Sequence, residues 1–305
     1  MAEGFGAMLR AWRRRRGLSQ LQLSGLAEVS TRHLSWLEAG KSEPSRAMVL
    51  RLATRLDVPL RERNALLAAA GFAPLYPQRG LDDPALARTR AAIQQLLDAH
   101  EPWPALAVNR HWQLVAHNRL VPLLLNQVAP ELAQPPLNVL RLSLHPLGLA
   151  PLIEGLQAWR EHVLARLQRQ CLATADPALQ ALHDELSAFP PPPGHAPWLA
   201  QVGDEAQALA DTPAAGAQAA APRLPPDVAV PLVLRSPWGR LNFITTVTVF
   251  GAPLDVSLAE LAIETLLPAD AATAEILRSV VAQLPARTGA VSPVTPPRAE
   301  NVLSF

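Results

Sequence analysis

The sequence predicts a chain of two domains, an all-α domain of five short helices followed by an α+β domain. Its 305 residues favour two domains over one. Helix-capping serines recur within the first 72 residues, whereas runs with strand character begin after residue 104. The Pro- and Gly-containing segment 73–84 separates the two patterns. We therefore expect domains at 1–72 and 104–284, joined over 73–103 by a linker and a connecting helix.

The first domain should hold a helix-turn-helix. Ser19, Ser30 and Ser45 can each cap a helix, because a serine hydroxyl accepts hydrogen bonds from the unpaired amides of a first turn. The run from Asp57 to Pro59 ends the fourth helix, and Gly71 stops the fifth. Five apolar residues supply a small core between the second and third helices: Leu23, Ala27, Val29, Leu34 and Leu37.

The spacing of these residues resembles the XRE family of bacterial and phage repressors over roughly residues 5–72. The resemblance rests on Leu18-Ser19-Gln20, Val29-Ser30 and Leu34-Ser35-Trp36-Leu37-Glu38-Ala39-Gly40. It implies a lambda-repressor-like fold that places its third helix in the DNA major groove. The family usually has Gly in the turn where this chain has Glu28, so we expect a mildly strained left-handed residue there.

The resemblance also implies which residues meet DNA. Thr31, Arg32 and Trp36 would face base edges, where Arg32 can bind guanine with two hydrogen bonds and the Thr31 methyl can contact thymine. Lys41 and part of the run Arg13–Arg16 would lie against phosphate. The full set of expected DNA-binding residues is Arg13, Gln20, Ser30, Thr31, Arg32, His33, Trp36 and Lys41. A helical domain used only for protein contact is the alternative.

The charge distribution favours DNA binding by the first domain. The whole chain has a net charge of only +1. Residues 1–72 hold 12 basic and 6 acidic side chains, a net charge of +6, and the remainder has a net charge of −5. A basic domain attached to an acidic one is expected when only the first binds nucleic acid.

Composition excludes several other classes of protein. The sequence has no apolar run of about 18 residues and no signal-peptide pattern, so we expect a cytoplasmic protein without membrane segments. Its single cysteine, Cys171, excludes an intrachain disulfide and a multi-cysteine metal site; we expect a buried inert thiol, with a thiol sensor as the alternative. No hydrolase, phosphate-loop or zinc-protease motif occurs, and the eight histidines are scattered, so we expect neither an enzyme nor a metal or cofactor site.

The second domain is expected to mix helices and strands. Its predicted helices are 84–99, 120–128, 149–172, 178–188, 257–266 and 270–284, and its predicted strands are 105–109, 112–118, 228–234 and 241–250. The segment 189–226 is rich in Pro, Ala and Gly and should be partly mobile, and the tail 285–305 should be disordered.

This order of elements resembles a PAS-like sensor fold, and more specifically the MmyB-like ligand-binding domain found behind XRE-type domains. The residues that carry the resemblance are Asn109-Arg110-His111-Trp112, Ala116-His117-Asn118, Leu144–Leu149, Trp159-Arg160-Glu161-His162, Thr245–Val256, Glu260–Glu264 and Pro268–Thr273. The family implies ligand-responsive transcriptional control, and its wider membership is associated with fatty-acyl ligands.

A sheet that curls around a cavity would hold a small apolar ligand through its inward side chains. The expected ligand-binding residues are Trp112, Leu114, Asn118, Trp159, Arg160, Phe243, Thr245 and Thr246, with Arg160 as an anchor for a ligand carboxylate. Three alternatives stay open: ordinary core packing of the tryptophans, an ion pair of Arg160 with Glu264 or Asp255, and helix capping by Asn118.

Together these patterns favour a homodimeric regulator that binds a double-stranded operator and responds to a small-molecule effector. A constitutive DNA-binding protein whose second domain only dimerises or binds a partner protein is the main alternative. An enzyme that carries a DNA-binding domain is the least favoured class.

Overall fold

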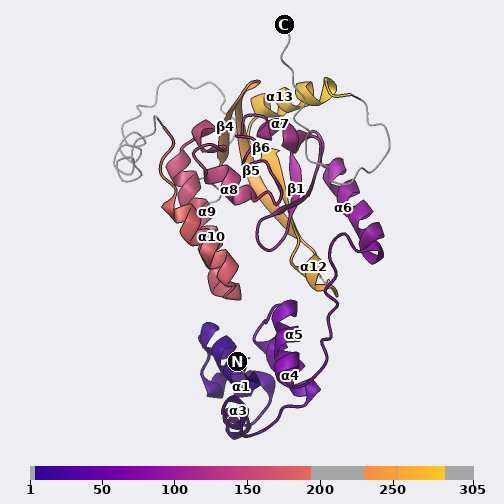
Figure 1. Cartoon of the computed structure of the whole chain (residues 1–305), viewed down its shortest axis with the longest axis vertical. Coiled ribbons are helices and arrows are strands. Elements are labelled where there is room, and N and C mark those ends of the chain that lie inside the picture. Colours follow the sequence, from indigo (N-terminus) through magenta and orange to yellow (C-terminus); the bar gives the residue numbers. More distant parts are fainter. Residues whose placement is uncertain (1–3, 194–229, 252, 286–305) are drawn as a thin grey trace. The chain divides into compact units, whose positions relative to one another are not determined.

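The computed structural model describes residues 4–193, 230–251 and 253–285, which group into two compact units (Figure 1). The first unit contains the N-terminal region up to Leu86 together with the short segments 170–175 and 250–260. The second unit contains the other described residues and all of the β-sheet. The predictions of a partly mobile segment and a disordered tail therefore fall, over residues 194–226 and 286–305, outside the described residues.

The first unit begins with the five predicted helices. They are α1 (Phe5–Arg15), α2 (Gln20–Ala27), α3 (Thr31–Glu38), α4 (Arg46–Arg55) and α5 (Leu60–Ala69). The predicted serine caps are present: Ser19 accepts from the Gln22 amide, and Ser30 and Ser45 each accept from the amide three residues later. Each cap satisfies an amide that the first helical turn leaves unpaired, which fixes where these helices begin.

Leucines from all five helices form the core of the domain. Leu9, Leu23, Leu34, Leu52 and Leu67 are fully buried and belong to one cluster. Their removal from water supplies most of the driving force that holds such short helices together.

Two backbone features bring α1, α2 and α3 together. A Cβ at Gly6 would lie 2.4 Å from the Leu37 carbonyl oxygen, so only glycine lets α1 approach the end of α3 this closely. Glu28 ends α2 with φ 55° and ψ 46°, as the resemblance implied. A side chain other than glycine is strained in this left-handed region, so the turn of the helix-turn-helix stores conformational energy.

The second unit is built on a six-stranded antiparallel sheet with strand order β2-β1-β6-β5-β4-β3. The strands are β1 (Ala105–Val108), β2 (Leu114–His117), β3 (Ile153–Glu154), β4 (Leu232–Ser236), β5 (Gly239–Val249) and β6 (Ala262–Pro268). The last strand, β6, therefore lies between the first strand and the hairpin formed by β4 and β5.

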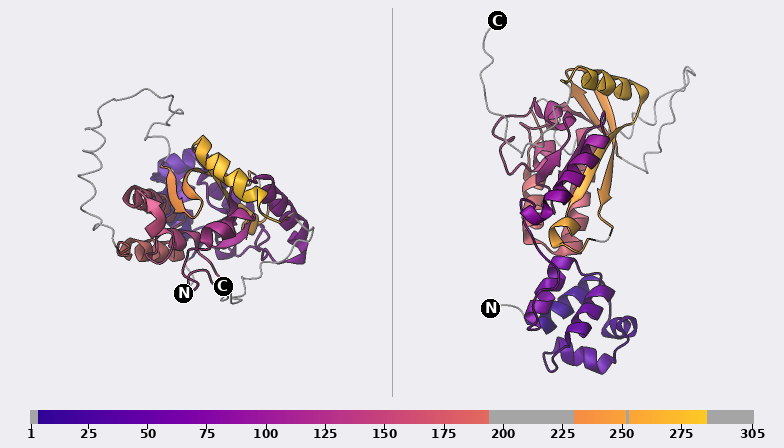
Figure 2. Two further views of the ribbon diagram at one scale, coloured as in Figure 1. Left: turned by 90° about the horizontal axis from the view of Figure 1, so that it is seen from above. Right: turned by 90° about the vertical axis from the view of Figure 1, so that its right-hand side faces the viewer.

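Helices cover both faces of the sheet. They are α6 (Ala87–Ala99), α7 (Leu120–Leu125), α8 (Val139–Leu144), α9 (Leu156–Thr174), α10 (Pro177–Ala188) and α13 (Ala271–Ala282). Figures 1 and 2 show the sheet with α9 and α10 on one side and α6 and α13 on the other. One face can therefore enclose space between the strands and α7, α8 and α9.

The prediction of a helix over 257–266 is wrong. The chain forms only the short α12 (Val256–Ala259) and then enters β6. In β6, Ile263 and Thr265 face one side of the sheet while Glu264 and Leu266 face the other, which is the period of a strand. The apolar run also fits helical spacing, but pairing with β1 and β5 satisfies its backbone groups on both edges.

Two further elements differ from the predictions. The helix expected from residue 149 begins only at Leu156, because Pro151 and the left-handed Gly155 interrupt helical geometry and leave a short 3-10 turn (Ala150–Leu152) and β3. Helix α8 was not predicted. Asn138 caps it by accepting from the amides of Leu140 and Arg141.

Candidate functional site

Helix α3 carries an exposed polar face. Ser30 caps its start, and Arg32 and Trp36 lie exposed on the side opposite the buried Leu34 and Leu37, whereas Thr31 is half-buried at the edge of this face. The Arg32 guanidinium lies 4.5 Å from the centre of the Trp36 ring, and Trp36 is 41% exposed. The exposed Trp36 ring holds the Arg32 guanidinium in place. Together they form a surface suited to a ligand that carries negative charge and flat bases.

Other predicted DNA-binding residues lie around this face. Thr31 shares a hydrogen bond of 2.9 Å with Ser24 of α2, so the two helices are joined at the start of α3. His33 is half-buried and donates its amide to the Ser30 hydroxyl. Lys41 is exposed, and its amide donates to the Trp36 carbonyl just beyond the end of α3.

Arg13 and Gln20 face inward. The Nε and Nη2 atoms of Arg13 donate to the two carboxylate oxygens of Glu38 at 2.5 and 2.9 Å, and Nε2 of Gln20 donates to Oε2 at 2.9 Å. The side chain of Glu38 is 0% exposed and that of Arg13 is 10% exposed. We therefore no longer assign Arg13 a phosphate contact, since its guanidinium is committed to a buried ion pair that joins α1 to α3.

Electrostatics at Glu38 agree with this geometry. Burial by itself raises the pKa of the Glu38 carboxyl, but hydrogen bonds from Arg13 and Gln20, together with the charges of Arg13 and Arg10, hold that pKa below its ordinary value. The carboxylate is therefore charged at neutral pH, and it orients α3 from inside the domain.

The second unit contains a cavity of about 100 Å³ between the sheet and helices α7, α8 and α9. Most of its surface is apolar, and leucines predominate. The lining residues are Leu106, Leu114, Val121, Leu124, Leu125, Leu137, Val139, Leu140, Leu142, Ser143, Leu149, Trp159, His162, Val163, Arg166, Leu232, Leu234, Thr245, Glu264 and Leu266. A concave, mostly apolar cavity with a few polar groups is the usual form of a small-molecule site.

The polar groups of the cavity come mainly from α9 and β6. Arg166 donates to Glu264 at 2.7 Å, and the face of the Trp112 ring lies 4.2 Å from the guanidinium. His162 stacks on Trp159 at 5.6 Å between ring centres. Burial lowers the pKa of His162, and the charges of Arg166 and Arg169 lower it further, so this imidazole is neutral at neutral pH.

Three of the predicted ligand-binding residues line the cavity: Leu114, Trp159 and Thr245. Thr246, the next residue of β5, is exposed and lies on the other face of the strand. Phe243 is fully buried in the core, and Trp112 reaches the site only through its contact with Arg166.

Asn118 and Arg160 do not line the cavity. Asn118 is 1% exposed; its side chain accepts from the amides of Ala105 and Leu120 and donates to the Trp103 carbonyl. We therefore assign Asn118 a structural role at the end of β2. Arg160 donates to the Ser187 carbonyl at 2.6 Å.

Sequence reasoning missed Arg166, Glu264 and His162. Arg166 lies seven residues after Trp159 and His162 lies three after it, which is the spacing of one helical face. That spacing could have found both residues. Glu264 was considered only as an ion-pair partner of Arg160, and its pairing with Arg166 was missed because its segment was predicted as a helix.

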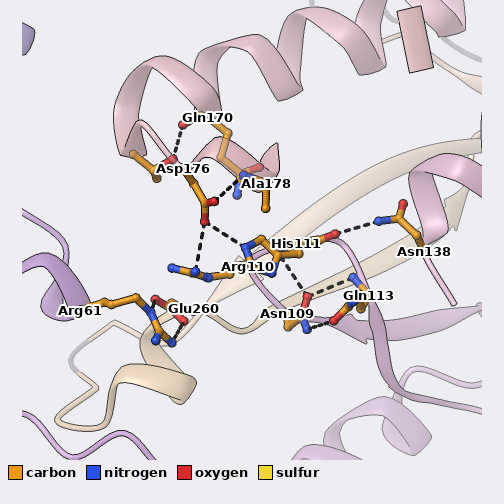
Figure 3. A network of polar contacts seen from close by, with 11 residues as sticks. Arg61, Asn109, Arg110, His111, Gln113, Asn138, Gln170, Asp176, Ala178 and Glu260 are labelled. Carbon is orange, nitrogen blue, oxygen red and sulfur yellow. Dashed lines mark hydrogen bonds and ion pairs between the residues drawn. The ribbon is translucent and has the colours of Figure 1, made fainter. Parts of the chain in front are cut away.

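The motif Asn109-Arg110-His111-Trp112 forms a structural corner (Figure 3). His111 and Arg110 lie 2.9 and 3.2 Å from the Asp176 carboxylate, which also caps α10. The His111 carbonyl accepts from Asn138, the cap of α8. These contacts tie the turn between β1 and β2 to the starts of α8, which lines the cavity, and of α10.

Comparison with known proteins identifies both domains. Residues 5–66 match the family model of a helix-turn-helix domain, and residues 89–195 match that of the MmyB-like transcription regulator ligand binding domain. Among solved structures, the chain is similar to the restriction-modification controller protein C.AhdI from Aeromonas hydrophila, with 37% identity over 19% of this chain and 89% of that one and a TM-score of 0.19. A comparison with curated proteins finds no match.

The chain is therefore a DNA-binding transcription regulator of the helix-turn-helix class. More narrowly, it combines a helix-turn-helix domain with an MmyB-like ligand-binding domain, which confirms the resemblance predicted from the sequence. In the part of the chain that the structure describes, no helix is long and apolar enough to span a membrane.

Proposed function

We propose that this protein is a sequence-specific transcriptional regulator whose second domain senses a small, largely apolar ligand of acyl type. The apolar cavity beneath α9 is the observation that carries the proposal. It lies in a unit much of which matches a ligand-binding domain, and it is lined mainly by leucine and valine. A flexible hydrocarbon chain is the ligand that such a surface binds best, because burial of its apolar area is favourable and non-directional.

A PAS-like fold for the second domain is part of this proposal. The first strand lies between the second strand and the last strand, and the intervening helices α7 to α10 come before the hairpin of β4 and β5. This order supports a sheet that curls around a ligand on one face.

On the DNA side, we propose that Thr31, Arg32 and Trp36 contact bases, while Ser30, His33 and Lys41 contact or flank the backbone. The exposure of α3 and the stacking of Arg32 on Trp36 support this assignment. We further propose a homodimer on an inverted repeat, because one helix-turn-helix buries too little surface for tight operator binding. Because the proposed partner is double-stranded DNA, we propose a cytoplasmic location.

Ligand dependence of DNA binding is the direct test. Native mass spectrometry with lipid extraction would identify a co-purified ligand, and fluorescence anisotropy on a selected operator would measure DNA affinity with and without it. A ligand can change this affinity only if it binds the DNA-competent and incompetent states unequally. We expect the ligand to change operator affinity of the full chain.

A matched pair of variants adds a control. Thr245→Trp fills the cavity and should abolish the ligand response while preserving DNA binding. Thr246→Trp adds the same bulk at the neighbouring exposed position and should leave the response intact. If no compound that binds the full chain alters operator affinity, the constitutive alternative replaces the sensor.

A further inference from the structure

The lining of the cavity already contains a complete ion pair. Arg166 Nη1 donates to Glu264 Oε1 at 2.7 Å, and both residues line the cavity. Their side chains are 26% and 12% exposed, so water screens this pair only in part. The guanidinium that would otherwise attract an anionic head group is therefore neutralised by a carboxylate of the protein itself.

The remaining polar groups of the lining add no net charge. His162 is neutral at neutral pH, because burial and the nearby arginines lower its pKa. Ser143 accepts the Trp159 indole N–H at 2.7 Å, and Thr245 contributes a hydroxyl. Arg169 is exposed and does not line the cavity, so solvent screens its charge.

We infer that the cavity selects amphiphiles with an uncharged, hydrogen-bonding head group, such as a primary amide or an alcohol, over free carboxylates. Glu264 is the residue that sets this preference. The inference rests on the proposed function, because it names the class of ligand for the same cavity.

Hydrogen-bond complementarity supports this selection. An amide carbonyl can accept from the guanidinium of Arg166, and its N–H groups can donate to the carboxylate of Glu264, so both charged groups keep partners. A ligand carboxylate would compete with Glu264 for one guanidinium. It would also bring a second negative charge close to the first in a site with little water, which is unfavourable.

The test compares ligands of one chain length on the wild-type full chain. Decanamide, 1-decanol and decanoate would be titrated by isothermal calorimetry at pH 7.5, where decanoate is ionised. We expect decanamide and decanol to bind at least about ten times more tightly than decanoate. If each of the three ligands binds and decanoate binds as tightly as the other two or more tightly, the inference is overturned. The proposed ligand-binding function would still be supported.

A charge-neutralising variant tests the role of Glu264 itself. Glu264→Gln keeps the size of the side chain but frees the charge of Arg166, so decanoate should gain at least about tenfold in affinity while decanamide changes little. Glu275→Gln makes the same change on the exposed surface of α13 and should alter neither affinity. Circular dichroism would verify that both variants fold. An unchanged preference in a folded Glu264→Gln variant overturns the assignment, and failure of every ligand to bind the wild type overturns both the proposed function and this inference.

Discussion

Replacement of Glu38 by Gln should destabilise the helix-turn-helix domain severely. The substitution keeps the size of the side chain but removes the negative charge that faces Arg13 in the core. Glu38 is 0% exposed and Arg13 only 10% exposed, so the remaining cation would stay largely buried without a counter-charge. Breaking a buried ion pair in this way costs about 3–5 kcal/mol. Because the Gln carbonyl still accepts one hydrogen bond, we expect the lower end, about 3 kcal/mol.

Native-state hydrogen exchange of the full chain is the suitable assay, because a protein of two units does not unfold in one step. Peptides from α1 and α3 should lose about 100-fold of their protection, the equivalent of about 3 kcal/mol. Glu43→Gln, an exposed position, is the matched control and should change nothing.

A double variant tests the reasoning further. Arg13→Met with Glu38→Leu removes both charges and should lose less protection than Glu38→Gln alone, since no buried charge remains unpaired. A loss below about 1 kcal/mol in Glu38→Gln, or a double variant that is less stable than the single one, would refute the argument.

Three further predictions concern single residues. Arg32→Ala should weaken operator binding by about 1–3 kcal/mol and relax specificity at one base pair. Lys41→Ala should weaken binding to all DNA sequences alike and reduce the slope of log affinity against log salt concentration by about 1. Fluorescence anisotropy would measure both effects. Glu28→Gly should stabilise the first domain by about 1 kcal/mol in hydrogen exchange, because glycine relieves the left-handed strain at φ 55°. His162→Gln should make thermal stability less sensitive to acid between pH 7.5 and 5. Because the pKa of His162 is lowered in the folded chain, the unfolded chain binds the proton first and wild-type stability falls as pH drops through about 6.5.

Each of these predictions has its own control. An unchanged site preference in Arg32→Ala would show that the orientation assigned to α3 is wrong. Glu28→Gln removes the same charge but keeps the Cβ, so a gain equal to that of Glu28→Gly would assign the effect to charge. His183→Gln serves as the control for His162, because His183 has a partly exposed side chain on α10.

The stability of the first domain at acid pH should also depend on the ion pair and hydrogen bonds of Glu38. Its carboxyl has a lowered pKa in the folded domain, so its stabilising contribution is complete above the ordinary value of 4.5. That contribution is lost as the pH falls through the lowered folded value. Protection of α1 and α3 in the wild type should therefore decrease in this acid range, and Glu38→Gln should lack this component.

The sequence by itself determined the features that depend on near neighbours. A serine cap satisfies amides two or three residues away, so Ser19, Ser30 and Ser45 could place α2, α3 and α4 without a tertiary structure. The outer face of α3 followed from its helical period. The left-handed turn at Glu28 followed from the resemblance, because the family usually has glycine at this position of the turn.

Only the tertiary structure decided the features that join distant segments. Glu38 draws Arg13 inward from 25 residues away, so a side chain typical of a surface becomes part of the core. The segment of β6 has apolar residues at both helical and strand spacing, and it becomes a strand because β1 and β5 satisfy its backbone on both sides. Arg166 and Glu264 lie 98 residues apart and meet only when α9 crosses the face of that strand. Local propensity cannot encode such a pair, because its energy exists only once the two elements are packed together.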